Sequence, residues 1–195
     1  MESKETHDLL ETLAPFYENI WAPIGMLISA RMRYSSIMKE VAKFLNSNSV
    51  IDLGAGTGKL RDFLNVSNYI ALDISSKFLK VLKKKRKSVD AIRGDVSKLP
   101  FKNESFEGVA MLFVLHLLKN KEEALREIRR ILKKDGKLFL TSLCKGGILS
   151  NILSNWWSVN PLNEKEYDEL LSKAGFEIIS SRKAGVWYFM KCKKL

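Results

Sequence analysis

Short apolar runs alternate with stretches of helical periodicity from about residue 49 to the end, and this alternation constrains the fold more than any other feature. The apolar runs cover residues 50–53, 69–73, 89–92, 108–114, 137–141, 176–179 and 186–190, and helical spacing fits 59–65, 75–86, 121–133 and 164–174. Strands that alternate with helices are typical of βαβ units, in which helices cover both faces of a mostly parallel sheet. The pattern therefore predicts an α/β protein with a doubly wound, mostly parallel, seven-stranded sheet.

The connection between the last two apolar runs differs from the others. Only residues 180–185 join them, which is too short for the crossover that a parallel pair requires. We therefore expect the final strand to pair in the antiparallel direction, as a C-terminal hairpin strand.

The first 46 residues carry a helical pattern instead of a mixed one. Apolar residues recur at three- and four-residue spacing in 24–30 and 37–45, which predicts N-terminal helices before the sheet. We expect residues 1–46 to form an N-terminal helical lid segment and residues 47–195 to form the domain that contains the sheet. Together they would make one compact unit.

Composition fits a single folded domain with a basic surface. A chain of 195 residues with 46% hydrophobic residues can build a substantial core. Lysine and arginine outnumber aspartate and glutamate by 33 to 22, so the formal net charge is +11. This excess favours anionic partners: nucleic acid, an acidic membrane surface or a negatively charged small molecule.

Several classes of protein are excluded by the sequence. Two histidines and two widely separated cysteines, Cys144 and Cys192, cannot assemble a Cys/His metal cage, so we expect no metal site. The longest apolar run, 108–118, is about half of the ~20 residues that a membrane span needs. The N-terminus is polar and mixed in charge, unlike a signal peptide. These features predict a cytoplasmic protein without a transmembrane segment.

A glycine-rich turn follows the first apolar run, where residues 52–58 read DLGAGTG. Glycines at such a turn allow a tight bend and close approach of the backbone to a ligand. The spacing is not the dinucleotide fingerprint, because the last position of G-x-G-x-x-G counted from Gly54 is Lys59. It is not a phosphate-binding P-loop either, because Leu60 follows that lysine. A purely structural turn is the alternative.

Acidic residues follow the next two runs. Asp73 ends the second run, about twenty residues after the glycine turn, where a carboxylate can accept hydrogen bonds from both hydroxyls of a ribose. An N-cap is the structural alternative, but Ser75 already suits that role. Asp95 follows the third run and can accept from the amino group of an adenine, with a turn aspartate as the alternative. Ligands of open α/β sheets bind beyond the carboxyl ends of the strands, so these residues should face one site.

These motifs, taken in order, resemble those of the class I S-adenosylmethionine-dependent methyltransferases. The resemblance is carried by VIDLGAGTG (50–58), ALDIS (71–75), GDV (94–96), LPF (99–101), FEGV (106–109), RRILKKDGKL (129–138) and LLSKAGFE (170–177). It covers about 49–192 and is strongest to the broad branch that includes the ubiquinone and menaquinone C-methyltransferases. It implies a Rossmann-like sheet, S-adenosylmethionine as cofactor and S-adenosylhomocysteine as product. Glu107 departs from the family's usual aspartate, at a position away from the cofactor.

The resemblance also implies a set of cofactor-binding residues. Asp52 and Gly54 would face the methionine amino group, and Asp73 would hold the ribose. The others would keep the loop close to the ligand, contact the adenine or line the cofactor from the fourth strand: Gly56, Thr57, Ile74, Asp95, Val96, Leu112 and Phe113.

Five further residues are candidates for the acceptor side of the site. His116 follows the fourth strand and has the reach and pKa of a general base, although a structural role is the alternative. Tyr17 and Arg31 would belong to the lid, and packing against the sheet is the alternative for most such residues. Trp156 and Trp157 follow the fifth strand, where they would stack on a flat substrate, touch a membrane interface or join the core.

The sequence favours a methyltransferase acting on a small-molecule or lipid-like acceptor. The rival hypothesis is a transfer RNA or ribosomal RNA methyltransferase that holds phosphates with its basic helices. Lysine and arginine cluster in 77–87 and 126–134, but a solvated helix surface explains such clusters too. No separate RNA-binding module is visible. A third class, a non-catalytic cofactor-binding protein, would need a damaged glycine loop, and this one is intact.

Overall fold

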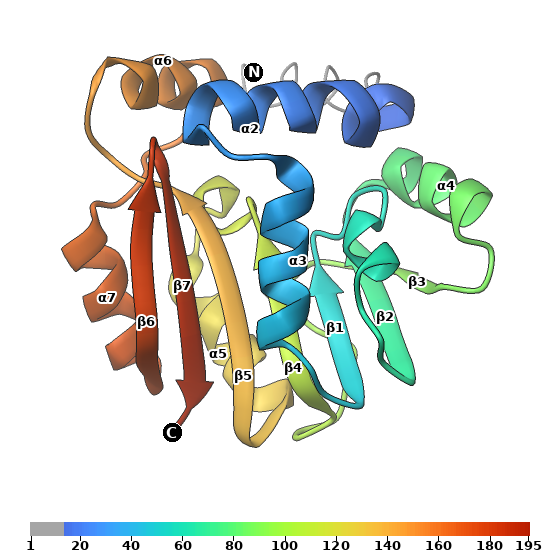
Figure 1. Cartoon of the computed structure of the whole chain (residues 1–195). Coiled ribbons are helices and arrows are strands. Elements are labelled where there is room, and N and C mark those ends of the chain that lie inside the picture. Colours follow the sequence, from blue (N-terminus) through green and yellow to red (C-terminus); the bar gives the residue numbers. More distant parts are fainter. Residues whose placement is uncertain (1–13) are drawn as a thin grey trace.

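A seven-stranded sheet in the order β3-β2-β1-β4-β5-β7-β6 forms the centre of the protein (Figure 1). The structure is a computed structural model and describes residues 14–195. Every neighbouring pair is parallel except the two that β7 makes with β5 and β6, which confirms the predicted doubly wound, mostly parallel sheet. The strands are β1 (Ser49–Leu53), β2 (Asn68–Asp73), β3 (Asp90–Arg93), β4 (Phe106–Leu112), β5 (Leu132–Leu143), β6 (Phe176–Ala184) and β7 (Trp187–Lys194).

Helices cover both faces of this sheet. Side chains of α5 and α7 join one buried cluster, whereas those of α2, α3 and α4 join a second cluster on the opposite face. The helices are α2 (Ala22–Ala30), α3 (Tyr34–Phe44), α4 (Ser76–Lys85), α5 (Lys121–Ile131), α6 (Ile148–Trp157) and α7 (Glu164–Lys173), with short helical turns at Ala14–Phe16, Tyr17–Trp21, Lys59–Asp62 and Leu115–Leu117.

Local sequence explains where the covering helices begin. Asn120 caps α5, because its side chain accepts a hydrogen bond from the Glu123 amide, and α7 opens with a capping box between Asn163 and Glu166. In α5, Leu125 and Ile128 lie on the buried face, as the helical spacing of the sequence requires.

Two elements differ from their predicted form. The helix predicted over 59–65 is wrong: one 3-10 turn, Lys59–Asp62, stands there, because the chain must return within a few residues to the start of β2. The strand β6 runs to Ala184, so the expected six-residue connection is a two-residue turn at Gly185 and Val186. Gly185 has φ +58°, and a Cβ there would collide with the Ser29 carbonyl of α2, so the tight turn docks directly on the N-terminal helix.

The chain described here contains neither a membrane-spanning helix nor a metal-ligand cluster. No helix within residues 14–195 is long and apolar enough to cross a bilayer. The same residues hold no group of three or more His, Cys, Asp or Glu side chains suited to a metal ion.

Candidate functional site

The glycine turn after β1 is held against the end of β2. The amides of Gly54 and Ala55 both donate to the Leu72 carbonyl, at 2.7 and 3.0 Å. Gly54, Gly56 and Gly58 have φ values of +70°, +55° and +77°, a conformation that side chains strongly disfavour. The three glycines are therefore required by the backbone path of the turn.

Close packing adds a second requirement at Gly54. A Cβ on this residue would collide with the Val114 side chain, which follows β4. At Gly56 the nearest atom to such a Cβ belongs to Phe78 of α4, at 3.7 Å. The turn is thus pressed against the end of β4 on one side and has ordinary van der Waals space on the other.

Asp73 lies at the carboxyl end of β2 and supports the turn. Its Oδ2 accepts a hydrogen bond from the Gly56 amide and its Oδ1 accepts one from the Ser75 amide, both at 2.8 Å. Ser75 is the N-cap of α4, as the sequence predicts. The neighbouring Ile74 is 56% exposed, so its side chain is available to a flat ligand beside this carboxylate.

Asp95 stands at the corresponding end of β3. The Gly94 amide donates to the Asp73 carbonyl at 3.1 Å, which ties the two strand ends together. Asp95 is exposed, and its Oδ1 accepts hydrogen bonds from the amide and hydroxyl of Ser97. These bonds hold the pKa of the Asp95 carboxyl below its usual value, so the group is ionised near neutral pH. Val96 is buried and anchors the loop in the core.

Asp52 is the buried carboxyl of the site. It lies in β1, is 3% exposed, and accepts a hydrogen bond of 2.8 Å from the Tyr69 hydroxyl. Burial raises the pKa of Asp52 to about 7; the Tyr69 hydrogen bond lowers it, and the charge of Asp73 raises it further. Near neutral pH this carboxyl is therefore poised between its neutral and charged forms.

The end of β4 brings an aromatic wall to the site. Leu112 ends the strand and Phe113 follows it with φ +61°, its amide donating to both the carbonyl and the hydroxyl of Thr141 on β5. The Phe113 ring packs edge-on against Trp187, with ring centroids 4.9 Å apart. Leu112 and Phe113 are both half-buried.

His116 is enclosed by aromatic rings and is neutral. It is 2% exposed, and its ring centroid lies 5.6 Å from that of Trp157 and 5.5 Å from that of Trp187. Burial, with a smaller effect from the Lys121 charge, lowers the pKa of His116 to about 3. Its Nδ1 accepts from the Leu143 amide at 3.3 Å, so the ring proton lies on Nε2 and Nε2 acts as a donor.

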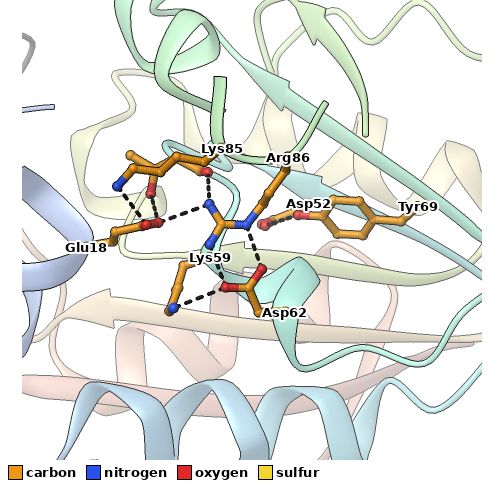
Figure 2. A network of polar contacts seen from close by, with 8 residues as sticks. Glu18, Asp52, Lys59, Asp62, Tyr69, Lys85 and Arg86 are labelled. Atoms are coloured by element: carbon orange, nitrogen blue, oxygen red, sulfur yellow. Dashed lines mark hydrogen bonds and ion pairs between the residues drawn. The ribbon is translucent and has the colours of Figure 1, made fainter. Parts of the chain in front are cut away.

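The N-terminal segment is fixed to the glycine turn by Glu18. This carboxylate is 6% exposed and reaches the Thr57 hydroxyl at 2.8 Å, Lys85 at 2.7 Å and Arg86 at 3.1 Å (Figure 2). Burial acts to raise the pKa of Glu18, but the hydrogen bonds from Lys85 and Thr57 and the charges of Arg86 and Lys85 outweigh it and hold the pKa below its usual value.

Arg86 joins three parts of the chain. Besides Glu18, it donates to the Thr57 carbonyl at 2.8 Å and forms a two-pronged ion pair with Asp62 (Figure 2). The residue caps the C-terminal end of α4. Bidentate geometry of this kind is the strongest that a guanidinium makes, so Arg86 fixes the turn, the 3-10 segment and the N-terminal segment together.

Two tyrosines continue this contact towards the strand ends. The Tyr17 ring packs edge-on against Phe78 with centroids 5.5 Å apart. Burial, and then the charge of Asp73, raise the pKa of Tyr17. Burial likewise raises the pKa of Tyr34 well above its usual value, with Tyr17 and Asp52 among its neighbours. Through Glu18 and Tyr17 the N-terminal segment therefore borders the glycine turn and α4.

The other residues predicted for the acceptor side, Trp156, Trp157 and Arg31, differ in how deeply they are buried. Trp157 is half-buried against His116, whereas Trp156 stacks on Trp157 at 6.2 Å and is 54% exposed. Arg31 is exposed at the C-terminal end of α2, with φ +55°.

Sequence reasoning missed three residues that shape the site: Glu18, Tyr69 and Arg86. Their partners Thr57, Asp52 and Asp62 lie far away along the chain. The only local signal was the position of Arg86 directly after a helix of basic residues.

We expect Glu18→Gln to loosen the N-terminal segment and to destabilise the protein by about 1–3 kcal/mol, because it removes a buried charge that faces two cations. Chemical denaturation at pH 7 measures this loss. The matched control is Glu104→Gln, because Glu104 is 61% exposed and pairs with Lys194 at 3.5 Å; an exposed pair of this kind contributes ~0–1 kcal/mol. Equal losses in the two variants would contradict the role given to Glu18.

Known proteins resemble this chain in sequence. A family model described as a methyltransferase domain matches residues 51–140. The chain is 31% identical over 163 residues to a demethylmenaquinone methyltransferase from Thermotoga maritima, covering 78% of this chain and 66% of that protein. It is 30% identical over 182 residues to an uncharacterised protein of Methanocaldococcus jannaschii, covering 91% of this chain and 77% of that protein.

A solved structure agrees with the fold. A methyltransferase from Thermotoga maritima described as SAM-dependent superposes with a TM-score of 0.76 at 21% identity, covering 96% of this chain and 99% of that one. At this identity the likeness bears on the fold alone. The chain thus spans just under two thirds of the length of the Thermotoga demethylmenaquinone enzyme.

Proposed function

The chain belongs to the class I S-adenosylmethionine-dependent methyltransferases, and we propose that it methylates a small, flat, lipid-like acceptor. A demethylated quinone is an example of such an acceptor. The observation that carries this proposal is the wall around His116. Trp157 and Trp187 pack against a neutral imidazole there, and Phe113 packs against Trp187. None of these four side chains is charged near neutral pH. An apolar ring system fits such a wall, whereas a phosphorylated acceptor would lose its hydration without gaining a counter-charge.

The acidic residues at the strand ends fit S-adenosylmethionine. Asp52 lies one residue before the end of β1, Asp73 ends β2, and Asp95 follows β3. They suit an ammonium group, a pair of ribose hydroxyls and an adenine amino group in turn. Gly54 and Gly56 let the backbone approach the ligand, with Thr57 beside them. Ile74, Val96, Leu112 and Phe113 supply apolar contacts and one amide at its edges. We propose these residues as the cofactor site.

The protein's own task in the reaction is orientation. Bound S-adenosylmethionine supplies a methyl group already activated on a sulfonium and leaves as S-adenosylhomocysteine. The chain's residues hold the acceptor in line with that methyl group, and orientation of this kind can lower a barrier by several kcal/mol. With its proton on Nε2, His116 is suited to donate a hydrogen bond to an oxygen of the acceptor. Tyr17 and the N-terminal segment would exclude water from the reacting atoms.

The basic helices give little support to an RNA acceptor. Lys83 donates to the carbonyls of Lys87 and Val89, whereas Lys85 and Arg86 bind Glu18. On α5, Arg130 binds Glu127 and two backbone carbonyls. These four of the twelve lysine and arginine side chains in 77–87 and 126–134 are thus already bound to groups of the fold.

Transfer of labelled methyl from S-adenosylmethionine tests the function. The protein would be incubated with host extract that is then separated into RNA, protein, lipid and small-molecule fractions. We expect label in the lipid or small-molecule fraction. Label confined to RNA would overturn the proposed acceptor class. Methylation of an RNA that is held through its phosphates would also fall steeply as the salt concentration rises.

The role of His116 is tested by its pH profile. We expect His116→Ala to retain cofactor affinity and to lose methyl transfer by ~10–100-fold, because one positioning hydrogen bond is removed. Wild-type activity should not follow a titration of this group between pH 5 and 9, because its pKa of about 3 lies below that range. His116→Gln retains a donor and should recover part of the rate. Full activity of His116→Ala at every pH would make the residue purely structural.

A further inference from the structure

Two helices at the carboxyl edge of the sheet contain no charged residue. In Figure 1, α2 and α6 lie across the top, where β1 and β4 point. Residues 19–30 and 146–162, which include both helices, hold no Asp, Glu, Lys or Arg. In the whole chain 28% of residues are charged, so two such segments at one edge are a marked departure.

These helices expose their apolar side chains. Leu27 is 61% exposed and Ile148 is 81% exposed, and seven more large apolar residues on these helices and the turn before α2 are 45–67% exposed. On α2 and the turn before it they recur at helical spacing, opposite the buried Ala22, Met26 and Ser29. We call this set the apolar face: Phe16, Ile20, Trp21, Ile24, Leu27, Ile28, Ile148, Ile152 and Trp156.

Charges of one sign border the apolar face. Arg31 and Arg33 follow α2, and Lys145 precedes α6; all three are exposed and form no ion pair within residues 14–195. The acidic residues nearest in sequence are already neutralised: Glu18 by Lys85 and Arg86, Glu40 by Arg182 and Lys191, and Glu164 by Lys183.

We propose that the apolar face binds the surface of an anionic phospholipid membrane. Apolar helices with exposed tryptophan and flanking basic residues lie in the interface plane, and their binding grows with buried apolar area and with attraction to anionic lipid. A second copy of the chain is a poor occupant, because it would bring Arg31, Arg33 and Lys145 against their own counterparts in a protein of charge +11.

The position of the apolar face links membrane binding to delivery of the acceptor, and this step rests on the proposed function. Trp156 belongs to the apolar face and stacks on Trp157, which contacts His116. A lipid-like acceptor would therefore pass from the bilayer along α6 to the aromatic wall without crossing water.

Sedimentation with sucrose-loaded vesicles tests the proposal. We expect the full-length protein to bind vesicles of phosphatidylcholine mixed with phosphatidylglycerol, and to bind phosphatidylcholine alone more weakly. The double variants Ile24→Ser/Leu27→Ser and Ile148→Ser/Ile152→Ser should each lose about ten-fold or more in partitioning. Arg33→Ser/Lys145→Ser should lose the preference for anionic lipid.

A matched control distinguishes binding through the apolar face from nonspecific hydrophobic binding. Ile179→Ser removes an apolar residue of similar exposure, 52%, from β6, and should leave partitioning unchanged. Failure of the wild type to sediment, or equal losses in Ile179→Ser and the helix variants, would overturn the proposal. So would dimerisation through the apolar face in analytical ultracentrifugation, removed by the helix variants.

Cofactor binding distinguishes the two proposals. The helix variants should bind S-adenosylmethionine as the wild type does, because they lie outside the cofactor residues. If vesicles are bound but no lipid or small-molecule fraction is methylated, the proposed function fails and the membrane surface stands. If methyl transfer occurs without vesicle binding, the membrane surface fails alone.

Discussion

Replacing Asp73 by alanine is expected to weaken S-adenosylmethionine binding by about 100-fold or more. The carboxylate is proposed to hold both ribose hydroxyls, and a hydrogen bond to a charged group contributes ~1.5–3 kcal/mol. The same carboxylate accepts from the amides of Gly56 and Ser75. Its removal therefore costs the ligand contact and also frees the glycine turn from its support.

Titration calorimetry with the cofactor measures the effect, and two variants make it specific. Asp90→Ala removes an exposed aspartate from the amino end of β3, the strand that neighbours β2, and should bind normally. Asp73→Asn retains one acceptor oxygen and should fall between wild type and Asp73→Ala. Cofactor affinity of wild-type strength in a folded Asp73→Ala protein would contradict the proposed site.

The topology was predictable because its signals are local. Each buried strand is recognisable as a short apolar run, such as 50–53 or 108–114. The covering helices are recognisable because apolar residues recur at every third or fourth position on their buried face. The six residues between the last two runs were enough to predict the antiparallel strand. Once this fold is predicted, the ligand site is expected at the carboxyl ends of the strands.

The features that the sequence did not predict depend on contacts between residues that are far apart along the chain. Glu18 meets Thr57 and Arg86 across separations of 39 and 68 residues, and no local pattern records such a pair. The helix expected over 59–65 shortens because Asp62 is drawn into the Arg86 ion pair and the chain turns towards β2. The helix α6 escaped prediction because 146–162 lacks the polar face by which surface helices are recognised.

Asp52→Asn is expected to stabilise the cofactor-free protein at alkaline pH while weakening cofactor binding. The pKa of Asp52 is raised to about 7, whereas an unfolded aspartate titrates near 3.9. Between these values the folded protein binds more protons than the unfolded chain, so this group makes stability fall as pH rises from about 4 to 7. Above pH 7 its full cost is present, on the order of 4 kcal/mol at ~1.4 kcal/mol per pKa unit.

Thermal unfolding at two pH values isolates this effect. At pH 5 the folded wild-type carboxyl is neutral and similar in shape to asparagine, which keeps an oxygen for the Tyr69 hydroxyl. The unfolded carboxyl is already ionised at this pH, so Asp52→Asn should unfold only about 3–6 °C higher than the wild type. At pH 8.5 the difference should grow to about 8–16 °C. A melting difference independent of pH would contradict the raised pKa.

Cofactor affinity should change in the opposite sense. A carboxylate that meets the ammonium of the cofactor must first lose its proton, so wild-type affinity should rise from pH 6 to pH 8, and Asp52→Asn should lie about ten-fold or more below it at pH 8. Tyr69→Phe is the matched variant, because it removes the hydrogen bond that lowers the pKa of Asp52. Its affinity should rise at a higher pH than that of the wild type. If Tyr69→Phe and wild type instead share one pH profile, the ionisation that governs binding belongs to another group, and the proposed pairing of Asp52 with the cofactor's amino group fails.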